Sequence, residues 1–467
     1  MNIMMQLLRV EVLRFVRNRV NLYVLAAFGL LLILSAVWAG LAARDYRAQV
    51  LAQAQHWGQV TDAARGAAAA AANAAPDGAK QALAAFTLGR SDHAIARLPA
   101  SGGLVLSVRQ FERLSPELRV SVESRHADAR KNDVLANPLL DGLGVPDFAT
   151  VMALLLPLAL IGLCYGLVQE DREQGIWRLV CTQCASLGGL LGAALLIRAG
   201  AVFGVAALAS ALAFLIDPGA DLASVATWIG CLLAYTLVWA AIAGMCALPA
   251  WSSGAAAIGM LGIWLAVSFV APAALAWVAD KNDPMPSRLD AIVAMRVAQQ
   301  NAEVAMDDLV TAWYRDHPQD RNPAYTSHTW PVTFVPRFLA QDEVVRPVMR
   351  AFDDSRARQV ETLERWSFLS PGLALVTGAD RLAGIDAPRY LRYVDAVNQH
   401  EDAWRAFLVP RIMGYRGLSV DDMARLPRFD PASIPEQSTL SVLWRLTALC
   451  VALFGIVVAG RRGLRRS

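Results

Sequence analysis

Long stretches of the chain contain no charged residue, and their lengths match membrane crossings. The longest covers residues 222–279 and contains no Asp, Glu, Lys, Arg or His. It is about twice as long as the roughly 20 apolar residues that cross a bilayer. Residues 249–254, near its middle, are rich in Pro, Ser and Gly, which favour a turn. The run therefore predicts a hairpin of two membrane helices, residues 222–248 and 255–279.

Four further apolar runs predict single membrane spans, which brings the total to six. They cover residues 20–43, 148–169, 187–216 and 439–460. The uncharged part of the third span begins after Arg198, which we place on its flank. Arg445 is then the one charge inside a span, close enough to an end to reach the interface. The first run is longer than the apolar core of a cleaved signal, so we expect it to remain as a helix.

The basic residues beside the spans predict which side of the membrane each segment occupies. They are concentrated before the first span, between the second and third spans, and in a basic tail at residues 461–467. Because positive flanks stay in the cytoplasm, we expect both termini to be cytoplasmic in a bacterial inner membrane. Four tryptophans are then expected in an aromatic belt at the outer interface: Trp38, Trp228, Trp277 and Trp444.

Two long polar insertions, residues 44–147 and 280–438, would then lie outside the cytoplasm. The second has helix-start signals at Ser287, Pro347 and Pro388, each followed by apolar residues at helical spacing. The first contains two alternating segments, residues 104–108 and 118–122, that predict strands. We expect a mostly helical α+β extracytoplasmic domain on a mainly α, polytopic membrane protein.

Composition agrees with alternating membrane and polar parts. The 467 residues are 56% hydrophobic and 18% charged, which is too apolar for an ordinary soluble enzyme. The net charge of +3 gives no indication of nucleic-acid binding. The six cysteines lie in or beside the apolar runs, so no disulfide framework is expected in the insertions. Cys181 and Cys184 have the spacing of half a zinc site, but no second pair of ligands follows, and we predict no metal.

Two short segments on the cytoplasmic side are candidates for function. Residues 1–19 form an amphipathic stretch with arginines between apolar residues, which is typical of a helix in the membrane interface. Residues 170–186 begin with Glu170, Asp171 and Glu173, and negative charge favours a helix N-terminus. This second segment predicts a short cytoplasmic helix that a partner could grip, although such charges are also common in solvated loops.

A set of short motifs resembles the ABC-2-type transporter permeases, in the branch with large insertions after spans one and five. The motifs are Asn-Pro-Leu-Leu at residues 137–140, Asp147-Phe148, Leu-Pro-Leu at 156–158, and Glu-Asp-Arg-Glu-Gln-Gly at 170–175. Others follow in the second insertion, among them Asp-His-Pro at 316–318 and Leu-Pro-Arg-Phe at 426–429. The glutamate-rich turn is the most specific of them. The family usually has Thr after the glycine, where this chain has Ile176.

The resemblance implies a function. In that family two permease subunits sit on two cytoplasmic ABC ATPase subunits, and residues equivalent to Glu170, Asp171, Glu173 and Gly175 form the coupling helix that docks on the ATPase. The partners implied are that ATPase, a second permease subunit and membrane lipid, with a periplasmic protein as a further candidate. The chain contains no GxxxxGK[ST] loop, so ATP-Mg is expected on the partner and no cofactor on this chain.

Small residues in the third span suggest a helix contact. Gly200 and Gly204 form a GxxxG pattern, which lets two membrane helices approach closely. Chance spacing in a chain rich in Gly and Ala is an equally good explanation.

Three other functions remain open. An intramembrane enzyme would need ionisable residues inside the spans, and the six histidines all lie in the insertions. A mechanotransmission subunit would pass ATP-driven movement to an outer partner without moving a substrate. A receptor or adaptor would bind a ligand outside and need no ATPase. The sequence favours an exporter permease but does not identify its substrate.

Overall fold

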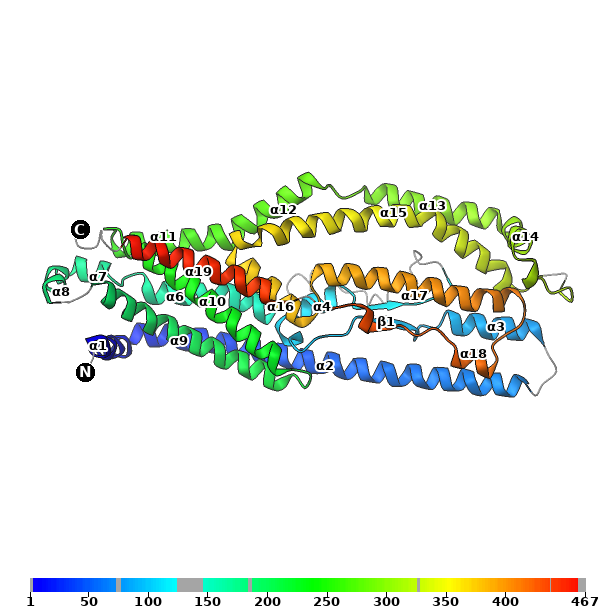
Figure 1. The fold of residues 1–467 in the computed structure, drawn as a ribbon, viewed down its shortest axis with the longest axis horizontal. Helices are drawn as coiled ribbons and strands as arrows, with labels where there is room; N and C mark the ends of the chain where they lie inside the picture. Colours follow the sequence, from blue (N-terminus) through cyan, green and yellow to red (C-terminus); the bar gives the residue numbers. More distant parts are fainter. Residues whose placement is uncertain are drawn as a thin grey trace.

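The structure is a computed structural model that describes residues 3–72, 77–123, 146–183, 187–325, 328–436 and 438–460. Within these ranges the chain is mainly helical and elongated (Figure 1). Residues 137–140, Cys184 and the basic tail at 461–467 lie outside the described residues, as do residues 184–186 of the predicted coupling segment.

Six helical segments are long and apolar enough to cross a membrane, as expected for a multi-pass membrane protein. They are α2 (Arg19–Ala72), α6 (Phe148–Cys164) with the α7 turn that follows, α9 (Leu187–Ile216), α10 (Leu222–Cys246), α11 (Ser253–Leu265) with η3 (Ala266–Val270) and α12 (Ala271–Asn282), and α19 (Leu440–Gly460). The fifth contains the π-helical turn η3 where the sequence predicts a regular helix.

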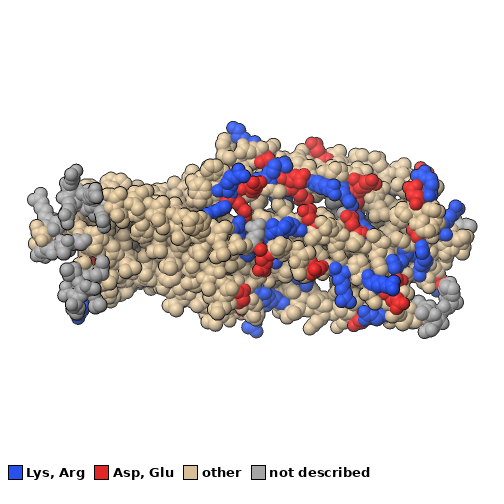
Figure 2. All heavy atoms as spheres, viewed as in Figure 1, with Lys and Arg blue, Asp and Glu red and all other residues tan. Residues whose placement is uncertain are grey.

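Charged side chains divide the molecule into two halves. On the face shown in Figure 2 the Lys, Arg, Asp and Glu side chains gather over the half opposite the termini. The half built from α6, α9, α10, α11 and α19 carries almost none on that face (Figures 1 and 2). The charge-free surface suits a bilayer, and the charged half is the part formed by the two insertions.

The two insertions form one elongated outer part. Its main helices are α3 (Gly78–Gly89), α13 (Arg288–Val304), α14 (Met306–Asp316), α15 (Trp330–Trp366) and α17 (Ala387–Met413). The shorter pieces are η4 (Pro318–Asp320), η5 (Ser367–Leu369), α16 (Pro371–Ala383), α18 (Val420–Ala424) and η6 (Pro431–Ser433). Helix α2 enters this part without a break, and its 54 residues make it about 81 Å long.

The prediction that a helix starts at Pro347 is wrong. Pro347 lies inside α15, which also contains Pro336. Proline in a helix interior removes one hydrogen bond, but packing can hold the helix together. Helix α15 packs against α12, α13, α14 and α17, and these tertiary contacts explain why it continues through both prolines. The helix predicted to begin at Pro388 is present as α17.

Only part of the predicted strand pair is present. Strand β1 (Ile95–Arg97) pairs antiparallel with β2 (Glu117–Arg119), with Ala96 opposite Leu118. β2 covers the start of the segment predicted at 118–122, whereas β1 was not predicted. The segment at 104–108 is not a strand: it forms η1 (Leu104–Leu106) and leads into α4 (Val108–Arg113).

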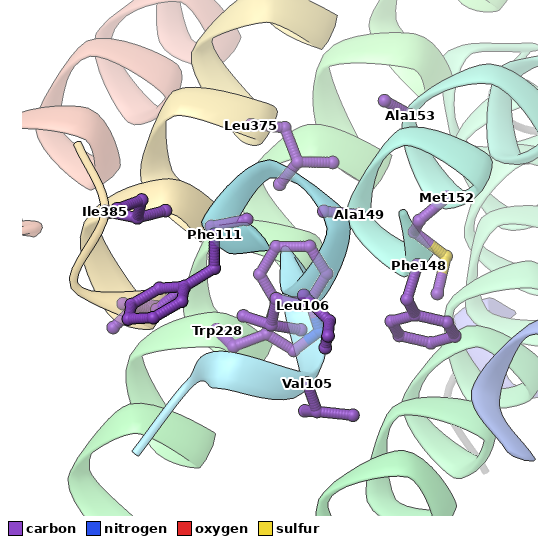
Figure 3. Close-up of a cluster of buried hydrophobic side chains, with 14 of the residues drawn as sticks. Val105, Leu106, Phe111, Phe148, Ala149, Met152, Ala153, Trp228, Leu375 and Ile385 are labelled. Carbon is purple, nitrogen blue, oxygen red and sulfur yellow. The ribbon is translucent and has the colours of Figure 1, made fainter. Parts of the chain in front are cut away.

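The reason for this difference is that residues 104–106 are buried on every side. Leu104, Val105 and Leu106 are completely inaccessible and belong to the main core. A strand would direct consecutive side chains to opposite faces, whereas here all three consecutive side chains enter the core. Figure 3 shows Leu106 from this insertion between Trp228 of α10 and Phe148 of α6, with Val105 below it. The first insertion therefore packs directly against the ends of the membrane helices and is not connected to them by the chain alone.

Trp228 is part of this joint rather than of an aromatic belt, so its predicted location is wrong. Its side chain is fully buried, and its indole N–H donates to Ser210 Oγ at 3.0 Å. Trp277 and Trp444 are exposed, as residues of a belt would be. An ion pair joins α2 to the end of α9, where the Arg47 guanidinium donates to both carboxylate oxygens of Asp217 at 2.6 and 3.1 Å.

Candidate functional site

The segment predicted to couple to a partner forms a tight turn at the end of the molecule where both termini lie (Figure 1). It consists of α7 (Gln169–Glu173), a turn, and α8 (Trp177–Gln183). Gly175 has φ +75°, a conformation that costs residues with a Cβ about 1 kcal/mol. A glycine at this position lets the chain reverse between the two short helices.

Asp171 does not point toward a partner, because it is held inside the protein. It is buried, and its carboxylate accepts two hydrogen bonds from the Arg14 guanidinium, at 2.6 and 3.3 Å. Burial opposes the charge on Arg14, but its hydrogen bond and charge interaction with Asp171 outweigh that effect and raise the guanidinium pKa. The contact joins α7 to α1 (Ile3–Arg17), the predicted amphipathic helix.

Helix α1 lies as an interfacial helix would, but one of its charged side chains is buried. Figure 1 shows it nearly end-on, across the direction of α2. Its apolar residues Val10, Leu13 and Val16 are exposed, as expected for contact with lipid, whereas Glu11 is buried against the protein. The acidic side chain in the middle of the helix therefore has a structural partner inside the molecule.

That partner is Arg198, which the sequence analysis placed on the flank of the third span. Arg198 lies inside α9 and is 6% exposed, and Glu11 is 2% exposed. The guanidinium donates to Glu11 Oε2 at 3.3 Å, to the Leu163 carbonyl at 2.9 Å and to the Ala194 carbonyl at 3.2 Å. The expectation that Arg445 is the one charge inside a span is wrong, because Arg198 lies within α9 and is buried there.

Two further contacts join α7 to the link between α10 and α11. Gln169 is fully buried, and its side-chain amide donates to the Cys246 carbonyl at 3.0 Å. Arg172 donates to the Pro249 carbonyl at 2.8 Å and lies 5.4 Å from the ring centre of Trp177. Displacement of α7 would therefore pull on the ends of both helices of the hairpin.

Glu173 caps the fifth membrane helix. Its carboxylate accepts the backbone N–H of Ser253 at 2.7 Å and the hydroxyl of Ser253 at 2.9 Å. Ser253 is the first residue of α11, so a negative charge sits at the positive end of that helix. Glu170 is half-buried, and its side chain folds back over Gly166, where an added Cβ would collide with Glu170 Oε1.

The surface left for a partner is the tip of the turn. Glu173, Gln174 and Gly175 are exposed, and beside them Ile176 and Leu179 are 42% and 56% exposed. This combination of one carboxylate, a glycine turn and two apolar side chains can bind a groove on another protein. Of the four predicted coupling residues, Glu173 and Gly175 lie on the tip, Glu170 borders it and Asp171 is internal.

Gly200 and Gly204 pack against no other helix within the described part of the chain. A Cβ added at either position would meet no atom within 4 Å, and Gly200 is exposed. The surface around them also presents Leu196 and Leu208, both exposed. A contact through this face, as a GxxxG pattern suggests, would therefore involve lipid or another chain.

Sequence reasoning did not identify Glu11, Arg14, Arg198 or Ser253 as part of this site. Glu11 offered a signal, because a carboxylate among arginines and valines in a short apolar helix requires a partner. Arg198 offered another, since apolar residues continue on both sides of it. No group of three or more His, Cys, Asp and Glu side chains in the described ranges is arranged to hold a metal ion.

One comparison with known proteins gives a match. A family model described as "Domain of unknown function (DUF3526)" matches residues 288–432, which lie in the second insertion. No curated protein and no solved structure matches the chain.

Proposed function

We propose that this chain is the permease subunit of an ATP-binding cassette transporter in a bacterial inner membrane. It works with two copies of a separate ATPase that binds ATP-Mg, and with a second permease subunit. Both termini and the α7–α8 turn face the cytoplasm, and the two insertions form the extracytoplasmic domain. The resemblance of residues 170–175 to a coupling helix supports this proposal.

The observation that carries the proposal is the set of contacts behind the turn. Asp171 joins it to α1, Arg172 joins it to the link after α10, and Glu173 joins it to the start of α11. A partner that grips the exposed tip and moves it would displace three membrane-embedded elements together. A turn that served as a passive connection would not need charged contacts to all three.

The direction of transport proposed is export. The outer domain packs onto α6 through residues 104–106 and onto α6 and α10 through α16, and so covers the outer ends of these helices. Mechanotransmission is the second candidate, and the length of α2 favours it. A single helix of 54 residues that passes from the terminal end into the outer domain can carry movement to a periplasmic partner.

Purification of the tagged chain from its native membranes tests the proposal. We expect a chain with a GxxxxGK[ST] loop to copurify in a 1:1 ratio, and ATP turnover to depend on that chain. A receptor or adaptor would purify without a nucleotide-hydrolysing partner, and that result would refute the proposal. Reconstituted vesicles then separate the two ABC functions, because only an exporter moves a substrate in an ATP-dependent way.

A further inference from the structure

The outer domain contains a cavity of about 440 Å³ that the proposed function does not use. Helix α2, strand β1, the residue that follows β2, helix α17, and α18 with the segment after it line this cavity, which is open on one side. Its volume falls within the range of small-molecule sites, about 300–1,000 Å³. The lining residues on which the argument depends are Trp57, Arg65, Arg97, His400, Trp404 and Arg428.

One side of the cavity is aromatic. Trp57 and Trp404 have ring centres 6.5 Å apart, and His400 lies 6.3 Å from Trp404 and 5.5 Å from Phe429. Burial lowers the pKa of His400, so the ring is neutral at physiological pH and behaves as another flat wall. Trp404 is 2% exposed and lies behind this wall, so the rings that can stack on a planar or apolar ligand are the partly exposed Trp57, His400 and Phe429.

The charges around the cavity are of one sign. Arg65, Arg97 and Arg428 line it, and no Asp or Glu in the described part of the chain does so. Arg97 is engaged by Glu117 at 2.9 Å and by Gln53, and Arg65 by the exposed Asp62 at 2.8 Å. Arg428 is exposed and forms no ion pair with any residue that the structure describes. Its guanidinium is available to bind an anion.

The cavity is too far along α2 for a lipid that stays in the bilayer. Trp57 follows the predicted end of the first span, residue 43, by about 21 Å of helix at 1.5 Å per residue. A ligand must therefore arrive from the aqueous side.

We infer that this cavity binds a small soluble organic anion with an aromatic or flat apolar body. The body stacks against Trp57 and the wall formed by His400 and Phe429, and the carboxylate or phosphate of the ligand pairs with Arg428. The ligand is recognised by the Arg428 guanidinium, which lies at the edge of the aromatic side of the cavity. The inference does not depend on ATP coupling, because no residue of the cavity belongs to the α7–α8 turn.

Calorimetric titration with 2-naphthoate tests this inference. The full chain is placed in nanodiscs of phosphatidylcholine. This lipid has no net charge, so it does not compete with the anionic ligand for the cavity. We expect saturable binding that weakens about 5-fold or more in Arg428→Gln, because a charge-assisted hydrogen bond is lost. Arg425→Gln removes an exposed arginine three residues away that does not line the cavity, and we expect it to bind as the unaltered chain does.

Two further arms test the shape and the source of the ligand. The uncharged analogue 2-naphthamide should bind more weakly than 2-naphthoate, and Thr61→Trp, which fills the cavity while keeping its arginines, should abolish binding. Three results would overturn the inference. One is that 2-naphthoate does not bind, the second is that Arg428→Gln and Arg425→Gln lose affinity for it equally, and the third is that 2-naphthamide binds as tightly as 2-naphthoate. Displacement of 2-naphthoate by nanodiscs of phosphatidylglycerol would also overturn it, because the occupant would then be a membrane lipid.

Discussion

Arg198→Met is expected to lower the free energy of unfolding by about 3–5 kcal/mol, the largest stability effect of any single substitution considered for this chain. The variant leaves the buried Glu11 with only its longer contact to Arg14, at 3.8 Å, and the carbonyl oxygens of Leu163 and Ala194 lose a donor. A carboxylate that is 2% exposed cannot regain the lost interaction from water. Helix α1 should then detach from α9 and release the contact between Arg14 and Asp171.

Thermal unfolding in a mild detergent measures this effect, with Arg9→Met as the matched control. Arg9 lies in the same helix as Glu11 but is exposed, so its loss should shift the midpoint little. The double variant Glu11→Gln with Arg198→Met should recover part of the stability, because no unpaired charge remains. Equal midpoints for Arg198→Met and Arg9→Met would show that the buried pair contributes nothing.

The second large effect is expected on ATP turnover. Glu170→Ala combined with Glu173→Ala removes the carboxylate at the tip of the turn and the one that borders it, and Glu173 also holds the N-terminus of α11 through Ser253. Each hydrogen bond to a charged group contributes about 1.5–3 kcal/mol, so a fall of about 10-fold or more in coupled turnover is expected. The measurement is ATP hydrolysis by the purified complex in lipid.

The matched control for this prediction is Glu361→Ala in the outer domain. Glu361 forms an exposed ion pair with Arg365 at 2.8 Å, and such pairs contribute little. The control should keep full turnover and full ATPase association. If the Glu170/Glu173 double variant did the same, the turn would not be the coupling element, although the chain could still be a permease.

The membrane helices were predictable because their signal is long and physically simple. A run without charges, such as residues 222–279, leaves few alternatives to a membrane hairpin, and Pro and Gly mark its turn. The helix after Pro388 was also predictable, since proline suits the first turn of a helix. These signals are local, so the sequence carries them without help from distant contacts.

The errors occurred where distant contacts decide. Residues 104–108 alternate like a strand, but the core takes three consecutive side chains from them. Pro347 looks like a helix start, but α15 is held on several sides. Arg198 looked like a flanking charge because its partner, Glu11, is far away in sequence. The acidic segment at 170–175 was predicted to begin a short helix, which is present as α7, but sequence alone could not separate the internal Asp171 from the exposed Glu173.

The central claim, that the tip of the α7–α8 turn contacts a separate ATPase, is tested most directly by site-specific photo-crosslinking in native membranes. A photoreactive residue at Gln174, which is exposed at the tip, should yield an adduct with a chain that contains a nucleotide-binding loop. The same residue at Gln55, exposed on the outer part of α2, should yield no such adduct. An adduct with the ATPase at Gln55, or none at Gln174, would contradict the account.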